Sequence, residues 1–115
     1  MKKRAAIALA LLAMLGACTT VSQGGYYWGA YSPTYFEMVK NPSPETTERR
    51  LEALTDIIEV SADKGLRVPP GVYAERGMMF IETDKTRAMS DFQAEIAAYP
   101  EAEPFIERLV ARFAD

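Results

Sequence analysis

Hydrophobic residues in the middle of the chain recur at the spacing of an α-helix. The pair Ser43-Pro44 is a typical helix start, because the serine hydroxyl can cap a free backbone N–H and proline has a helical φ. The pair Lys64-Gly65 is a typical helix end, because glycine readily adopts the left-handed conformation that terminates many helices. We therefore predict a helix over 44–64, with an apolar stripe formed by Leu51, Leu54, Ile57, Ile58 and Ala62.

A shorter helix is predicted just before this one. Ser32-Pro33 repeats the start signal, with Ser32 as the capping residue and Pro33 as the first helical residue. Asn41-Pro42 ends the helix, because the residue before a proline avoids the helical conformation. The pattern thus predicts a first helix over 33–40.

Three more helices are predicted after residue 71. The third follows the Pro-Pro-Gly sequence at 69–71 and ends at the turn signal at 83–84. The fourth ends before Pro100, and the fifth begins at 101–104 and continues to Phe113. No stretch shows the sustained period-two alternation that is typical of strands. The predicted fold class is all-α.

The segment 73–100 resembles a tetratricopeptide repeat, which pairs two helices through large, small and aromatic residues at set spacings. One interval, from the glycine to the first alanine, is a residue short, so a generic helical hairpin is the alternative. The segment 35–62 is then a degenerate preceding hairpin, and the fifth helix caps one open face of these short tetratricopeptide-like hairpins. The matching positions are Tyr73, Gly77, Phe80, Ala88, Phe92, Glu95 or Ile96, and Pro100.

The start of the chain has the pattern of an export signal. Three basic residues precede the uncharged run 5–15, which would reach only about 16 Å as a helix, well short of the ~30 Å hydrocarbon core of a bilayer. The run ends in a branched residue, two small residues and the only cysteine, and this order resembles the lipobox of bacterial lipoproteins. The alternative is an ordinary secretory signal with an incidental cysteine. The residues of the lipobox are Leu15, Gly16, Ala17 and Cys18.

The lipobox implies a lipid anchor on Cys18. In bacterial lipoproteins this cysteine receives a diacylglycerol, the signal is cut before it, and the freed amine is acylated. Two or more acyl chains give firm anchoring. Thr19, in place of an aspartate, implies the outer membrane with the protein facing the periplasm. The expected organisation is a signal peptide over 1–17, a lipidated cysteine and short linker over 18–25, and a helical domain over 26–115.

Composition excludes several classes of chemistry. The chain has no histidine and one cysteine, which argues against a usual metal site, an internal disulfide and a cysteine redox pair. Removing the three basic residues of the signal changes the net charge from −3 to −6, and this acidic balance argues against nucleic acid as a partner. The paired carboxylates, such as Glu45 and Glu48, have arginine neighbours or helix-surface positions. We therefore expect no catalytic residue, no metal, no cofactor beyond the lipid on Cys18, and no enzyme.

Aromatic residues gather at the start of the helical domain. Six of the twelve aromatic residues of the chain lie within 26–36. Trp28, Tyr31, Tyr35 and Met38 fall at helical offsets, which favours packing over the first hairpin. Tyrosine and tryptophan are also typical of docking surfaces and of platforms for sugar rings, because they combine apolar area with a polar group. The candidate partner-binding residues are Tyr26, Trp28, Tyr31 and Tyr35.

The helical domain resembles a family of small proteobacterial lipoproteins classed as a domain of unknown function. Members combine a Tyr-x-Trp-Gly-x-Tyr start after the lipobox with a Pro-Pro-Gly segment before a helix. The resemblance implies two partners, a lipoprotein like the curli secretion channel and a second small lipoprotein, and it implies no activity. The residues that carry it are Tyr26, Trp28, Gly29, Tyr31, Pro69, Pro70, Gly71 and Gly77.

These observations lead to one functional hypothesis and one alternative. The hypothesis is an outer-membrane lipoprotein that is an accessory subunit or adaptor of a cell-envelope assembly, with other envelope lipoproteins as partners. The alternative is a periplasmic module that binds peptidoglycan or a peptide through Trp28 and Tyr31.

We predict that Cys18→Ser releases the protein from the membrane fraction and abolishes incorporation of radiolabelled palmitate, because serine has no thiol to receive the diacylglycerol. Fractionation and labelling in a Gram-negative host measure both effects. Ser22→Ala, four residues further on, is the control and should change neither. A Cys18→Ser chain that remains in the membrane fraction would contradict the assignment.

Overall fold

The computed structural model describes residues 25–114, which form five α-helices and one 3-10 turn. No strand occurs within this range, and the predicted all-α class is confirmed. The elements are α2 (Tyr31–Lys40), α3 (Pro44–Asp63), α4 (Val72–Phe80), α5 (Lys85–Ala98), η1 (Pro100–Ala102) and α6 (Glu103–Ala111).

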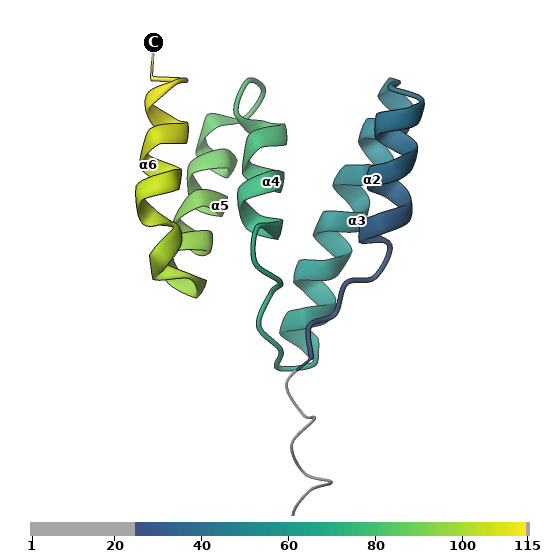
Figure 1. Cartoon of the computed structure of the whole chain (residues 1–115), viewed down its shortest axis with the longest axis horizontal. Helices are drawn as coiled ribbons and strands as arrows, with labels where there is room; N and C mark the ends of the chain where they lie inside the picture. Colours follow the sequence, from purple (N-terminus) through teal and green to yellow (C-terminus); the bar gives the residue numbers. More distant parts are fainter. Residues whose placement is uncertain (1–24, 115) are drawn as a thin grey trace, which may run out of the picture.

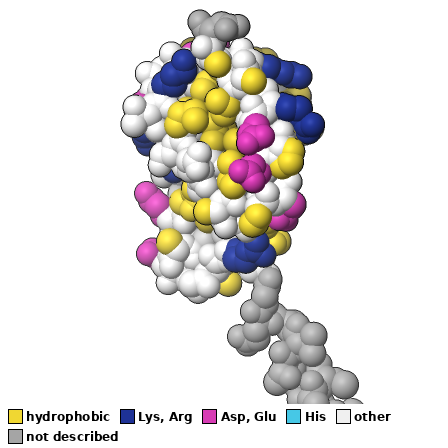
Figure 2. Space-filling view, turned by 90° about the vertical axis from the view of Figure 1, so that its left-hand side faces the viewer, with side chains coloured by type: hydrophobic (Ala, Val, Ile, Leu, Met, Phe, Trp, Pro, Cys, Tyr) yellow, Lys and Arg dark blue, Asp and Glu magenta, His cyan; other side chains and the backbone are white. Residues whose placement is uncertain are grey.

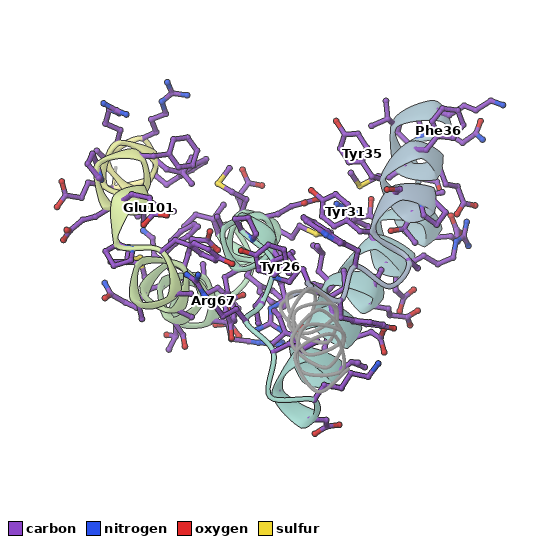
Figure 3. The ribbon with its side chains drawn as sticks, turned by 60° about the horizontal axis from the view of Figure 1, so that its bottom comes forward. Tyr26, Tyr31, Tyr35, Phe36, Arg67 and Glu101 are labelled. Atoms are coloured by element: carbon purple, nitrogen blue, oxygen red, sulfur yellow. The ribbon has the colours of Figure 1, made fainter. Side chains whose placement is uncertain are left out.

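The helices form a layered stack in which each packs mainly on its neighbours in sequence. Helices α2 and α3 make one antiparallel pair, α4 and α5 make a second, and α6 lies beside α5 (Figure 1). Seen from below, α2, α4 and α6 lie along one side of the stack while α3 and α5 lie along the other (Figure 3). The two predicted hairpins are therefore present, and their assignment to the tetratricopeptide class stays a prediction.

Helix α3 has the two ends that its sequence predicts. The Ser43 hydroxyl accepts the Thr46 backbone N–H at 3.1 Å, and the Thr46 hydroxyl accepts the Ser43 backbone N–H at 2.9 Å, so the two residues form a reciprocal capping box. At the other end Gly65 has φ +64°, and Leu66 N–H donates to the Ser61 carbonyl at 2.8 Å. This is a Schellman motif, which satisfies carbonyls that the helix leaves free.

Helix α2 begins earlier than its sequence predicts. The predicted cap at Ser32 is wrong, because α2 starts at Tyr31 with Ala30 in the cap position and no side-chain cap. A turn centred on Gly29 (φ +44°) precedes it, in which Tyr31 N–H donates to the Trp28 carbonyl at 2.9 Å. Pro33 is tolerated in the first turn, since the backbone N–H it lacks would have no partner within the helix.

The α4–α5 hairpin is held by a close approach at Gly77. A Cβ at this position would lie 2.7 Å from a ring carbon of Phe92 and 3.1 Å from the carbonyl oxygen of Ala88. Both facing residues are fully buried, and Phe80 and Ile106 pack against them in the same cluster. The predicted role of Gly77, which is to let the two helices approach, is confirmed.

A second hydrophobic cluster lies under the aromatic segment, between α3 and α4. Leu54, Ile57 and Val72 are fully buried there, with Tyr27 and Tyr31 packed against them. Helix α6 contributes Ile106 to the first cluster, which confirms that its stripe covers the α4–α5 pair. No helix among residues 25–114 is long and apolar enough to cross a membrane.

We predict that Gly77→Ala destabilises the protein by about 1–2 kcal/mol. The gain in helix propensity, about 1 kcal/mol, is smaller than the cost of pushing Phe92 away in a packed core. Urea unfolding followed by circular dichroism measures the difference. Ser90→Ala, on the exposed surface of α5, is the matched control and should change stability by less than about 0.5 kcal/mol. An unchanged or raised midpoint for Gly77→Ala would show that the hairpin can relax around a methyl group.

Candidate functional site

The predicted partner-binding residues differ in exposure. Tyr26, Trp28 and Tyr35 are 40%, 42% and 50% exposed, whereas Tyr31 is half-buried. Trp28 precedes α2 and does not share its helical face, so the predicted helical offset from Trp28 to Met38 is wrong. The turn at Gly29 separates the tryptophan from the helix. Figure 3 shows Tyr26 over the middle of the stack and Tyr35 on α2.

Three of these rings form a short edge-to-face series. The ring centroids of Tyr26 and Trp28 are 6.3 Å apart with an interplanar angle of 80°, and those of Trp28 and Tyr31 are 5.0 Å apart at 72°. This geometry is favourable for aromatic rings, because the positive edge of one meets the negative face of the next. The series links two exposed rings to one that the fold holds in place.

Tyr31 is fixed by a polar contact at its inner end. Its hydroxyl donates to the Glu75 carboxylate at 3.0 Å, which joins α2 to α4. Burial raises the pKa of Tyr31, and the negative charge of Glu75 raises this pKa further. The hydroxyl therefore stays protonated and donates throughout the physiological range.

Arg50 of α3 organises this end of the protein. Its side chain is completely buried, and it forms a bidentate pair with Glu75 through Nε at 2.7 Å and Nη2 at 2.8 Å. The remaining nitrogen donates to the Tyr31 carbonyl and to the Thr34 hydroxyl at 3.1 Å. A single guanidinium thus connects α2, α3 and α4 with charge-assisted hydrogen bonds.

The same guanidinium stacks against the aromatic segment. Its central carbon lies 4.0 Å from the ring centroid of Tyr31 and 5.3 Å from that of Tyr35. Cation–π attraction strengthens when the cation is desolvated, as Arg50 is here. Arg50 therefore holds the aromatic residues in position while their outer faces stay exposed.

Two buried carboxylates that sequence reasoning missed hold α4 and α5 together. Asp91 forms a bidentate pair with Arg76, at 2.7 and 2.8 Å. Glu95 accepts the backbone N–H groups of Gly71 at 2.7 Å and Ala74 at 3.3 Å, so it caps α4 where glycine offers no side chain. Each of the four carboxylate oxygens accepts a hydrogen bond within the protein, so both acids have a structural role.

The loop before α4 is held by a buried tyrosine. The Tyr99 hydroxyl donates to the Val68 carbonyl at 2.7 Å, and the Arg67 guanidinium lies 4.4 Å from the centroid of the Tyr99 ring. Burial, together with a contact to the Tyr26 hydroxyl, raises the pKa of Tyr99 to about 12. Tyr26 therefore borders this buried tyrosine while its own ring stays exposed.

Other predicted features are placed as follows. Cys18, Thr19 and the predicted lipobox lie outside the described residues. Arg49, next to Arg50, forms an exposed ion pair with Glu37 across the α2–α3 hairpin. Within residues 25–114 no three acidic or cysteine side chains come together as a metal site would require.

The fold and the site define a small all-α protein of stacked helical hairpins with exposed aromatic residues before and within α2. Residues 26–109 match the model of a family described as "Domain of unknown function (DUF4810)", and the chain belongs to this family. This match confirms the predicted membership in a family classed as a domain of unknown function. No curated protein and no solved structure matches the chain.

We predict that Arg50→Met destabilises the protein by about 3 kcal/mol, because it leaves the Glu75 carboxylate without its cation. Arg49→Met is a close control, since it removes a neighbouring arginine whose ion pair is exposed, and should cost less than about 1 kcal/mol. Urea unfolding monitored by the fluorescence of Trp28, the only tryptophan, measures both. Equal effects of the two variants would disprove the organising role of Arg50.

Proposed function

We propose that the protein is a lipid-anchored outer-membrane lipoprotein that serves as an accessory subunit or adaptor of a cell-envelope assembly. The lipobox ending at Cys18 supports the anchor, and Thr19 supports the outer membrane as its destination. The proposed partners are other envelope lipoproteins, including one that resembles the curli secretion channel. This last element rests on the family resemblance of the sequence.

One observation carries the adaptor role, namely the fixed and exposed aromatic segment beside the proposed anchor. Only seven residues separate Cys18 from Tyr26, and even fully extended they would reach only about 25 Å. Trp28 and Tyr35 expose about half of their surface while Arg50 and Glu75 fix the residue between them. Preorganised aromatic side chains lose little freedom on binding and are common anchors of protein interfaces.

The geometry also supports the alternative of a peptidoglycan- or peptide-binding module. Trp28 is 42% exposed, and its ring contacts with Tyr26 and Tyr31 are edge-to-face. An exposed indole ring can stack on the apolar face of a sugar ring. This alternative places the ligand on the same residues, so one variant tests both.

We expect Trp28→Ala to abolish crosslinks from the aromatic segment to envelope lipoproteins and to leave the amount of protein in the outer membrane unchanged. Living cells that carry a photo-crosslinking residue at Tyr35 report the contacts, and mass spectrometry identifies the partner. Phe105→Ala is the matched control, because it removes an aromatic residue of similar exposure, 55%, from the other end of the stack.

The same variant separates the two candidate functions. Loss of the crosslinks with unchanged binding to isolated sacculi supports the adaptor. Loss of sacculus binding, with no protein crosslink in the unmodified chain, supports the alternative and contradicts the adaptor. Circular dichroism of each variant verifies that the helical fold is kept.

A further inference from the structure

The exposed large hydrophobic residues of the described helices lie at the two ends of the helix stack. They belong to α2 and to α6, and none belongs to the inner helices α3, α4 and α5. Stacked helical repeats bury one face of each unit against the next, so an end without a polar cap leaves an apolar face uncovered. Both ends of this stack have such a face.

At the first end, α2 carries an apolar ridge, which we define as Tyr35, Phe36, Val39 and Lys40. Phe36 is 66% exposed and Val39 is 59% exposed, and Figure 3 shows Phe36 on the outer side of α2. Phe36, Val39 and Lys40 share one helix face, because they stand three and four residues apart. Lys40 lies 5.9 Å from the centroid of the Phe36 ring and gives the ridge a positive charge.

At the second end, a groove of about 360 Å³ runs between α5 and α6. Buried Phe92 and Ile106 form its floor, and half-buried Met89, Ile96 and Val110 form its walls. Figure 2 shows this face, with hydrophobic side chains gathered along its middle and acidic side chains beside them.

The edge of the groove is acidic. Glu103 and Glu107 both line it, and they stand four residues apart on the exposed surface of α6. Glu37 of α2 lies outside the ridge and is paired with Arg49 of α3, so the charge that the ridge presents is that of Lys40. The two ends of the stack are thus both apolar and opposite in charge, with a basic ridge and an acidic edge of the groove.

We propose that the α5–α6 groove binds the α2 ridge of a second copy of this chain. The contact is heterologous, because different surfaces of the two copies meet, and its repetition produces either a ring or an open row of copies. Phe36 and Val39 enter between α5 and α6, and Lys40 meets Glu103 and Glu107 at the edge. The proposal does not depend on the lipid anchor.

A cysteine pair in the full-length chain tests the contact and leaves Phe36, the most exposed residue of the ridge, in place. Val39→Cys lies on the ridge and Gln93→Cys lies in the wall of the groove. In cells treated with a short bismaleimide, a chain that carries both substitutions should give a ladder of dimers, trimers and higher species. Each single substitution should give no ladder beyond that of the unmodified chain, because a head-to-tail contact needs both surfaces.

A matched pair controls for random encounters. Val39→Cys combined with Ala62→Cys, an exposed position on α3 outside both surfaces, should give no ladder. Charge reversal then tests specificity: adding Lys40→Glu to the double-cysteine chain should reduce the ladder about fivefold or more, since it places like charges together. Further addition of Glu103→Lys and Glu107→Lys should restore it.

The possible results separate this inference from the proposed function. No ladder from the double-cysteine chain, a ladder insensitive to charge reversal, or a groove cysteine that crosslinks only to another protein would each overturn the inference. Failure of lipidation or of outer-membrane localisation, with the ladder intact, would contradict the proposed function and leave the inference standing.

Discussion

The guanidinium of Arg50 lies where α2, α3 and α4 meet, and the rest of this end of the protein depends on it. Removing a charge from water is costly, and the cost is offset here by a bidentate carboxylate, a carbonyl and a hydroxyl on two neighbouring helices. Because these partners come from separate elements, the guanidinium is satisfied only when all three helices are in place. The ion pair thus couples the first hairpin to the second, in addition to the hydrophobic cluster between α3 and α4.

This constraint also explains how the protein can display aromatic residues without losing order. Exposed rings at the start of a domain gain little from burial, so some other interaction must hold them. Arg50 stacks on Tyr31, Tyr31 meets Trp28 edge to face, and Trp28 meets Tyr26 in the same way. The buried arginine thus holds Tyr31, and Tyr31 in turn holds the exposed rings through edge-to-face contacts.

Two buried acidic residues hold the second hairpin together, as Arg50 holds the first hairpin to α4. Glu95 caps α4 from a position on α5, and Asp91 pairs with Arg76, so both helices are fixed along their length as well as by the close contact at Gly77. Hydrogen bonds and close packing therefore fix the inner helices of the stack, whereas the two outer helices, α2 and α6, keep exposed apolar residues. This architecture fits the proposed adaptor role, because the exposed apolar faces belong to helices that the interior holds in place.

The sequence by itself determined the helical class and both ends of α3, because capping and helix termination are set by residues a few positions apart. The close approach at Gly77 was predicted from the longer spacing of small and aromatic residues across the α4–α5 hairpin. The predicted lipobox also rests on a local pattern, and it lies outside the described residues. Only the tertiary structure decided which of two adjacent arginines is buried: Arg49 and Arg50 have similar neighbours along the chain, but Glu75 lies 25 residues from Arg50. The start of α2 and the exposure of each aromatic residue were decided in the same way, since they depend on contacts between helices that local sequence does not encode.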